Sequence, residues 1–414
     1  MSKHRKLKWP LLIVCGVAVV PAFVLGLWAY TALTAETYHP NPKDVTSVPG
    51  AAPLEKWAGA AEQARQLVRA SLAEQNLPGF SVAVGIAADG SSGEIVWAEG
   101  FGWADLVNKT PVKPDTRFRI GTASTALTSA AVGLLLEKGR LKLDDEIQTY
   151  VPEFPKKQWP VTLRRLMGHT AGLRNDGGDE GPLMEAHCKR PVDALQYFSD
   201  KPLLSEPGTK YHYSSYGWIL LSAAIEAAAG EPFLTFMENQ VFEPLGMNET
   251  KADSVAAPAA GRASSYFPRF AADPKYGLDP MREIDYSCYA GSSAFVSTAS
   301  DLVRFALAVS GHRRQGVGAE AGAFLQPATV QLLQTSQRLP SGEETGYGLG
   351  WDLETVQFGG AQTTTVGHDG DSLGGMVASL VTFPKHGIVV AVLSNSSYAD
   401  TAGVAVKVAQ AFAR

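Results

Sequence analysis

The sequence predicts an α+β protein in which one antiparallel sheet is built from both ends of the chain and flanked by helices. Strand patterns occur early, at 79–86 and 94–100, and return late, at 347–353, 363–367, 375–382 and 388–393. Between these two groups, residues 122–308 show mostly helical periodicity. We therefore expect a single unit of two lobes with a cleft between them, in which a mainly helical lobe is inserted into the sheet.

The first segment differs from the rest in composition. Five basic residues, Lys3, His4, Arg5, Lys6 and Lys8, precede an uncharged run over 9–30. This run of about 22 residues is long enough to span a bilayer, and basic residues before a span favour a cytoplasmic N-terminus. We expect residues 1–35 to be a membrane anchor, with 9–30 in the membrane and the domain on the outer (periplasmic) side. The alternative is a signal peptide that is removed, which leaves a secreted protein.

The following elements are predicted in chain order. Residues 36–54 are rich in Pro, Thr, Ser and Gly and are predicted to be a linker, which leaves 55–414 as the folded domain. Residues 55–75 have the periodicity of an amphipathic helix, and 79–86 and 94–100 form a hairpin through the turn at 88–93. An apolar helix starts near Thr122 and ends before Gly139. Further helices are predicted at 162–167, 191–199, 217–229, 232–241, 300–308 (with Ser300 as N-cap) and 401–413.

Composition excludes some functions. The chain has 414 residues, is 45% hydrophobic and carries a formal charge of -5, so nothing favours nucleic acid as a partner. No CxxC or HExxH pattern occurs, and we expect neither a metal nor a cofactor. Cys15 lies inside the apolar run, whereas Cys188 and Cys288 lie in loop-like sequence. These two either pair in an oxidising compartment or remain thiols, and the sequence leaves both states open.

Several segments in one order carry a family resemblance. They lie at 118–121, 139–145, 168–173, 211–217, 242–247, 297–302 and 367–370. With them, the chain after residue 53 resembles the serine beta-lactamase and penicillin-binding-protein-like family, in its class C, D-alanyl-D-alanine carboxypeptidase and esterase branch. Residues 150–155 are similar to the mitochondrial serine beta-lactamase-like members and their bacterial relatives. The resemblance implies a beta-lactamase/transpeptidase-like fold and an acyl-enzyme mechanism.

The family pattern identifies the candidate site. Its Ser-x-x-Lys positions are Thr122 and Thr125 here, and no lysine lies three residues after any nearby serine. Its Tyr-x-Asn positions are Tyr213 and Ser215, where the tyrosine would shuttle a proton and the serine would bind a substrate amide. Its Lys/His-x-Gly strand is represented by His368, Gly370 and the following Asp371. The resemblance further implies an oxyanion hole formed by the backbone N–H groups of Thr122 and Asp371. His169 is interpreted as framework for a turn.

Three functions follow from these residues. The first is a family member with impaired catalysis that binds a peptide, ester or amide, because a threonine nucleophile is crowded and has no lysine base. The second is an active hydrolase of the peptidase, esterase or beta-lactamase type that uses Thr122 with Tyr213 and His368. The third is a self-associating structural membrane protein. The sequence leaves the oligomeric state and the ligand open.

Overall fold

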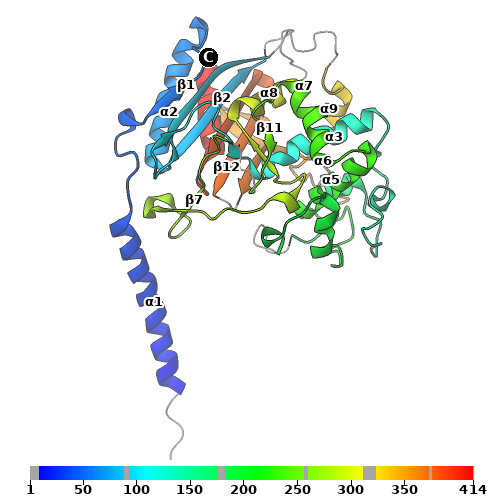
Figure 1. Ribbon diagram of the computed structural model, residues 1–414, viewed down its shortest axis with the longest axis horizontal. Coiled ribbons are helices and arrows are strands. Elements are labelled where there is room, and N and C mark those ends of the chain that lie inside the picture. The colour runs from blue at the N-terminus through cyan, green and yellow to red at the C-terminus, as the bar shows by residue number, and fades with distance from the viewer. Residues whose placement is uncertain are drawn as a thin grey trace, which may run out of the picture.

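The computed structural model describes residues 9–87, 93–175, 182–255, 260–310, 323–372 and 375–413. Figure 1 shows a two-lobed domain with one long helix extending from it. Eight strands of the described chain form an antiparallel sheet in the order β1-β3-β2-β13-β12-β11-β10, with β4 paired to β3. Their bounds are β1 Ser47–Pro49, β2 Gly79–Ile86, β3 Glu94–Asp105, β4 Thr110–Pro111, β10 Asp352–Phe358, β11 Ala361–Ser372, β12 Met376–Phe383 and β13 Ile388–Ser394. The predicted sheet from both chain ends is confirmed.

Two shorter pairings lie beside this sheet. A three-stranded sheet has the order β5-β9-β6, and β7 pairs with β8. The bounds are β5 Phe118–Arg119, β6 Lys251–Ala252, β7 Tyr266–Pro268, β8 Leu278–Pro280 and β9 Phe295–Ser297. The helices are α1 Trp9–Thr34, α2 Ala58–Glu74, α3 Ser124–Glu137, α4 Leu163–Met167, α5 Ser215–Ala229, α6 Phe233–Met237, α7 Glu243–Leu245, α8 Ala299–Val309, α9 Pro327–Leu333 and α10 Thr401–Phe412.

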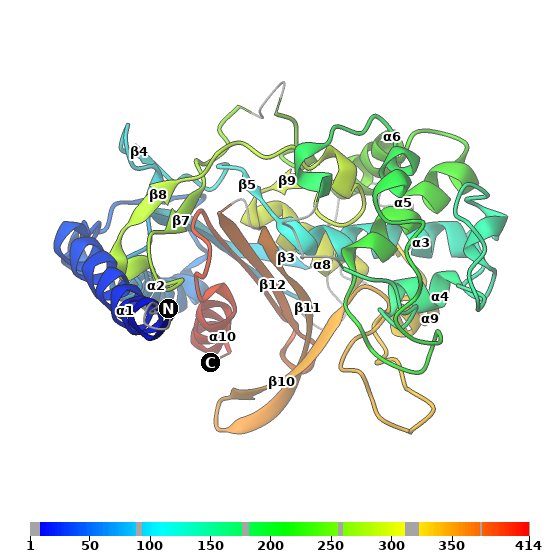
Figure 2. The ribbon, with the colours of Figure 1, turned by 90° about the horizontal axis from the view of Figure 1, so that it is seen from below.

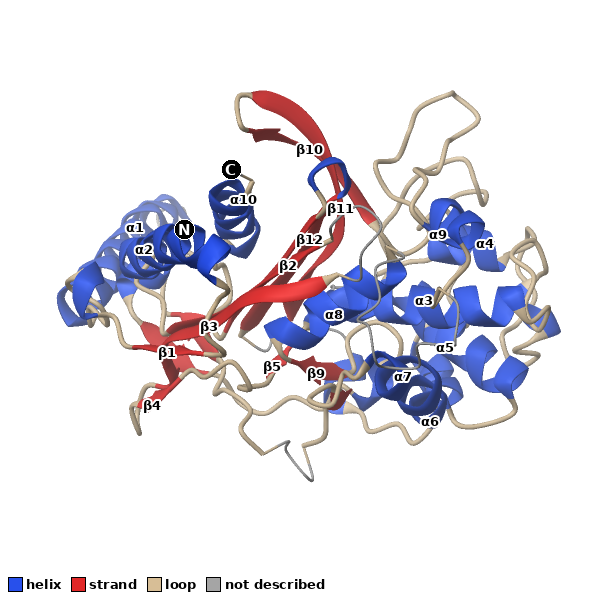
Figure 3. Ribbon diagram, turned by 90° about the horizontal axis from the view of Figure 1, so that it is seen from above, coloured by secondary structure: helices blue, strands red, loops and turns tan. Residues whose placement is uncertain are grey.

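Helices cover both faces of the sheet, as Figure 3 shows: α2 and α10 lie on one side, and α8 and the α3 lobe lie on the other. On α2, residues Ala61, Ala64, Val68 and Leu72 recur at helical spacing and are buried, which gives the helix one apolar face. Strand β13 is buried along its whole length because neighbours and helices enclose it. The sheet therefore has two hydrophobic cores, one on each face.

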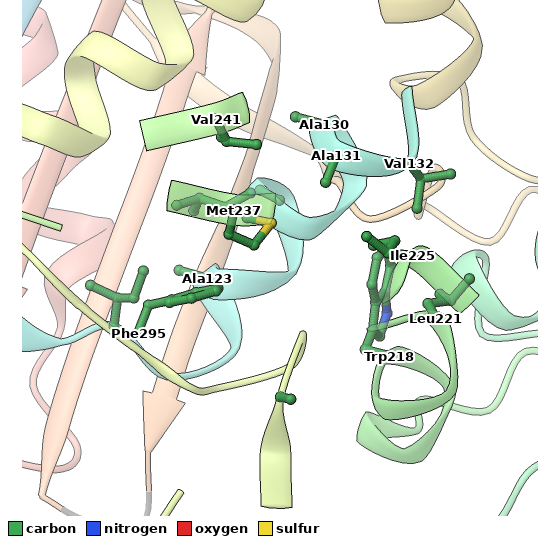
Figure 4. Close-up of a cluster of buried hydrophobic side chains, with 14 of the residues drawn as sticks. Ala123, Ala130, Ala131, Val132, Trp218, Leu221, Ile225, Met237, Val241 and Phe295 are labelled. Atoms are coloured by element: carbon green, nitrogen blue, oxygen red, sulfur yellow. The ribbon is translucent and has the colours of Figure 1, made fainter. Parts of the chain in front are cut away.

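The core of the helical lobe surrounds α3. In Figure 4, Trp218 and Ile225 of α5 face Val132 of α3, and Met237 approaches α3 from another side. All these side chains are buried. A helix that is apolar nearly all round is stable only when neighbours surround it, so the core fixes the position of the first turn of α3.

Some predicted elements differ from the structure. The strand expected at 347–353 is β10, which starts only at Asp352, because Gly346 and Gly350 adopt positive φ values of 71° and 96°. Helix α8 is capped by Thr298, whose side chain accepts a hydrogen bond from Asp301 N–H, rather than by Ser300. The helix expected at 232–241 divides into α6 and a π-helical turn, Glu238–Phe242. The turn predicted at 88–93 lies mostly outside the described residues.

The segment 36–54, predicted as a linker, packs on the domain. Strand β1 pairs with β3, with Val48 opposite Gly100. Val45 and His39 are buried, and the His39 ring lies 3.0 Å from the carbonyl oxygen of Pro78. The Pro- and Ser-rich composition is typical of a tether, but these few tertiary contacts fix its course.

The long helix α1 begins at Trp9 and ends at Thr34. Among the described residues, no single helix is both long and apolar enough to cross a bilayer. In α1, this criterion was applied to Val20–Thr34, which is apolar but shorter than a bilayer span. One bent pair of helices, Ser215–Ala229 and Phe233–Leu245, is long and apolar enough when the two are taken together, with an angle of 79° between them.

Cys188 and Cys288 form a disulfide, which resolves the alternative that the sequence left open. The bond joins positions 100 residues apart, and closing so long a loop restricts the unfolded chain. We expect the Cys188→Ala/Cys288→Ala variant to lose about 2–4 kcal/mol of unfolding free energy, measured by urea unfolding followed by tryptophan fluorescence. Cys15→Ala is the control and leaves the midpoint unchanged. An unchanged midpoint in the double variant contradicts the prediction.

Candidate functional site

The first candidate residue, Thr122, lies in a tight turn before α3. The helix expected from Thr122 is preceded by a 3₁₀ turn, Gly121–Ala123, and the α-helix begins at Ser124. Gly121 permits this turn with a φ of 50°. Thr122 is partly exposed, and its Oγ1 donates a hydrogen bond to the carbonyl oxygen of Asp369 at 3.1 Å. The hydroxyl thus contacts strand β11 directly.

Thr125, one helical turn further, is fully buried. Its Oγ1 has no hydrogen-bond partner among the described residues. One more turn along this face, Ser129 donates from Oγ to the carbonyl oxygen of Leu349 at 2.6 Å. Ser129 therefore contacts the loop before β10, whereas Thr122 contacts β11, and the lysine position of the family pattern holds a neutral hydroxyl.

His368 lies on β11 with only 3% of its surface exposed. Its Nδ1 is 2.6 Å from the carbonyl oxygen of Asp369, and its Nε2 is 2.8 Å from the hydroxyl of Tyr347. A carbonyl can only accept, so Nδ1 carries the proton in the neutral ring and Nε2 accepts from Tyr347. Both ring nitrogens are engaged, and Thr122 and His368 share one acceptor.

The Gly370 position places β11 against the turn before α3. A side chain there would meet the carbonyl oxygen of Ile120 at 1.9 Å and the backbone nitrogen of Ala123 at 2.7 Å. Only glycine permits so close an approach. The next residue, Asp371, is exposed and pairs with Val377 of β12. The oxyanion hole formed by the N–H groups of Thr122 and Asp371 stays a prediction.

Tyr213 and Ser215 lie at the start of α5. The ring of Tyr213 stacks on His169, with centroids 4.1 Å apart and planes at 30°. Ser215 is buried, and its backbone N–H donates to Oδ1 of Asn175 at 3.3 Å. The carbonyl oxygen of His169 accepts from His212 N–H at 2.7 Å, and its φ is 55°, which fits a residue that shapes a turn.

Tyr347 connects the two halves of the candidate site. Its ring lies 4.6 Å from His169, 6.5 Å from Tyr213 and 5.7 Å from His368, between centroids. Burial raises the pKa of Tyr347 well above its usual value, so the hydroxyl stays protonated and donates to His368. Burial likewise lowers the pKa of His169 well below its usual value, so this ring stays neutral.

Sequence reasoning missed Tyr347 and the ring contacts of His169. The segment 346–351 alternates glycine with other residues, and this Gly-rich signal indicated a loop rather than the strand that was predicted. The structure brings Thr122, His368 and Gly370 together and joins Tyr213 to them through an aromatic cluster of His169, Tyr213, Tyr347 and His368. In the described part of the chain, no group of His, Cys, Asp and Glu is arranged to hold a metal.

Comparison with known proteins places these residues in a family. Residues 64–413 match the family model described as Beta-lactamase. The chain is 26% identical to the human serine beta-lactamase-like protein LACTB, mitochondrial, over 448 residues that cover 86% of this chain and 80% of that protein. It is 30% identical to penicillin-binding protein 4* of Bacillus subtilis over 281 residues, 65% of this chain and 59% of that protein.

Solved structures share the fold. The octameric penicillin-binding protein homologue from Pyrococcus abyssi superposes with a TM-score of 0.69 at 24% identity, over 85% of this chain and 76% of that chain. EstCE1, a hydrolase with promiscuous acyltransferase activity, superposes with a TM-score of 0.65 at 23% identity, over 86% and 99%. Because the family model matches most of this chain, the chain belongs to the beta-lactamase family of serine hydrolases and penicillin-binding-protein-like proteins.

Proposed function

We propose that this family member has lost most of its acyl-transfer activity and acts at the cell envelope by binding a peptide, ester or amide at the Thr122 site. The observation that supports this most strongly is the state of Thr125 and His368, the two positions of the family pattern that would assist Thr122. Thr125 replaces the lysine base with a buried hydroxyl, and His368 uses both ring nitrogens in hydrogen bonds to Tyr347 and Asp369. The Thr125 hydroxyl is too weak a base to take the proton of Thr122, and the Nε2 lone pair of His368 is occupied by the Tyr347 hydroxyl.

The expected size of the loss follows from general acid–base catalysis. A positioned general base contributes about 10²–10⁴-fold to a rate, and residues that act as one unit lose most of that rate with the first member removed. The β-methyl of Thr122 adds restriction at χ1. The close approach of β11 to the turn before α3 at Gly370 is a backbone feature that does not depend on the base, so loss of the base leaves this part of the site in place for a bound ligand.

The envelope location has two supports. The Cys188–Cys288 disulfide is typical of an oxidising compartment. The basic residues before 9–30 and the apolar character of that run favour an uncleaved anchor with the domain outside the cytoplasm. Figure 1 shows α1 extending away from the domain, and its side chains from Val20 on are largely exposed. Alkaline carbonate extraction of cell membranes tests the anchor, because a spanning protein stays in the pellet.

The activity is tested by labelling the full chain in detergent with a fluorescent penicillin and with a fluorophosphonate. We expect the unmodified protein to label no faster than Thr122→Ala, since the reactive hydroxyl has no base. Thermal stabilisation by an uncleaved D-alanyl-D-alanine peptide, measured in parallel, reports binding. Rapid labelling of the unmodified protein that Thr122→Ala abolishes would instead establish the active hydrolase.

A further inference from the structure

The helix α1 is attached to the hairpin between β7 and β8. Nε1 of Trp28 donates to the hydroxyl of Tyr276 at 3.4 Å, and the Arg269 guanidinium lies 3.4 Å from the carbonyl oxygen of Thr34 at the end of α1. A cation at a helix C-terminus is favoured by the helix dipole. Figure 1 shows the C-terminal end of α1 close to this hairpin and the rest of the helix extending away, and Figure 2 shows the same elements from below.

Asn76 ties the exit of α1 to the same hairpin. Its Oδ1 accepts from the backbone N–H of Tyr38 at 2.9 Å, and its Nδ2 donates to the carbonyl oxygens of Glu36 at 2.9 Å and Pro274 at 3.2 Å. One buried side chain thus satisfies groups from the segment after α1 and from the hairpin. The helix leaves the domain at a fixed place beside residues 269–277, without an intervening flexible tether.

The exposed residues of α1 indicate its surroundings. Phe23 is 70% exposed, Trp28 45% and Tyr30 63%, so a large part of each side chain is left uncovered by the rest of the described chain. At about 1.5 Å per residue, the uncharged run 9–30 spans about 33 Å, close to the roughly 30 Å thickness of a hydrocarbon core. Trp28 and Tyr30 then lie at the outer end of the span, where Trp and Tyr concentrate in membrane proteins.

We propose that the tip of the β7–β8 hairpin, residues 269–277, lies in the headgroup layer of the bilayer and forms a collar with the end of α1. The collar consists of Trp28, Tyr30, Phe270 and Tyr276. The Phe270 and Tyr276 rings meet edge to face at 5.4 Å, and the bond from Trp28 holds Tyr276 at the depth of that residue. The inference rests on the proposed membrane anchor, and it adds that the domain is docked on the lipid in one orientation.

The charges of the tip point to a neutral lipid surface. Arg269 pairs with Asp279 at 3.0 Å, and Lys275 pairs with Asp273. Because each of these cations has a carboxylate partner, the tip has no excess positive charge that would require anionic lipid. We expect the aromatic side chains alone to hold the tip in the headgroup layer, so the test uses a bilayer of phosphatidylcholine, a lipid without net charge.

The test places an environment-sensitive fluorophore on the hairpin of the full chain. Lys275→Cys, in a Cys15→Ser background, carries the probe, and Glu343→Cys on an exposed loop before β10 is the matched control. The protein is reconstituted into phosphatidylcholine vesicles that carry a quencher at headgroup depth. We expect a blue-shifted emission and at least about twofold quenching at position 275, the depth of interfacial aromatics, and neither change at position 343.

Flotation of the same vesicles separates the two ideas. Protein that floats with lipid while the probe at 275 stays unquenched keeps its anchor and overturns the collar. A blue shift without quenching by the lipid means that another protein chain covers the hairpin, which also overturns it. Protein that fails to float disproves the anchor and the collar together. In a Trp28→Ala/Tyr276→Ser variant, flotation persists and quenching at 275 falls toward the control value.

Discussion

Restoring the nucleophile and the base, by Thr122→Ser with Thr125→Lys, is expected to raise labelling by a fluorescent penicillin about 10²–10⁴-fold over the unmodified protein. Thr122 lies beside Gly370 on a backbone that closely approaches β11. Thr125 is buried one turn away on the same helix face, so a lysine there reaches the new serine. Burial lowers the pKa of such a lysine toward the range of a useful base.

The control has the same bulk without the amine. Thr122→Ser with Thr125→Met places a long apolar side chain at the base position, and we expect it to label no faster than Thr122→Ser alone. Thermal unfolding of all four proteins shows whether each variant is folded. Equal labelling of the lysine and methionine variants would show that the base position is not what limits the reaction, and it would contradict the proposal.

The second large effect concerns Arg119, which lies on β5 just before the site. Its side chain is 2% exposed. Its Nε donates to the carboxylate of Asp253 at 2.7 Å, and its Nη2 donates to the carboxylate of Glu283 at 2.9 Å. Asp253 is equally buried and keeps one further partner, Arg262, at 2.7 Å. Because Arg262 remains, we expect Arg119→Met to cost about 3 kcal/mol, the lower end of the range for a broken buried ion pair.

Urea unfolding of the full chain measures this loss. The control is Arg338→Met, since the Arg338–Glu344 pair is more than half exposed on both sides, and exposed pairs contribute about 0–1 kcal/mol. We expect Arg119→Lys to recover only part of the stability, because a lysine cannot reproduce the two-sided contact of a guanidinium. A full recovery with lysine would mean that charge alone, rather than the shape of the guanidinium, holds the network together.

The fold was predictable where periodicity is strong. Strand 79–86, strand 388–393 and the helices at 217–229 and 401–413 agree with β2, β13, α5 and α10 within two residues. In these elements, burial of one face or of both faces produces a regular spacing of apolar residues, which can be recognised in the sequence. In segment 36–54, single buried residues such as Val45 pack on the domain, which composition does not reveal. The strand expected at 347–353 was wrong for most of its length because Gly350 has a positive φ, and a side chain there would meet Trp218 at 2.6 Å.

The candidate site was predictable only as chain positions. The resemblance located Thr122, Tyr213 and His368, but no spacing rule relates Tyr347 to His368 or His169 to Tyr213. These contacts join α5, β11 and loops distant in sequence, and they decide the hydrogen-bonding state of the imidazoles. The sequence therefore located the family positions, but it did not reveal which side chains contact them, and these contacts decide whether each position could take part in catalysis.

The antiparallel pairing of β2 with β13 has a consequence for the order of synthesis. Val84 lies opposite Val390 at the centre of the main sheet, so the first and last parts of the domain must meet before that sheet is complete. Pairings so distant in sequence make folding slow. The nascent chain therefore stays without its finished sheet until residues 388–394 have been released from the ribosome. Such a delay agrees with the location outside the cytoplasm that we propose, because an exported chain crosses the membrane before it folds.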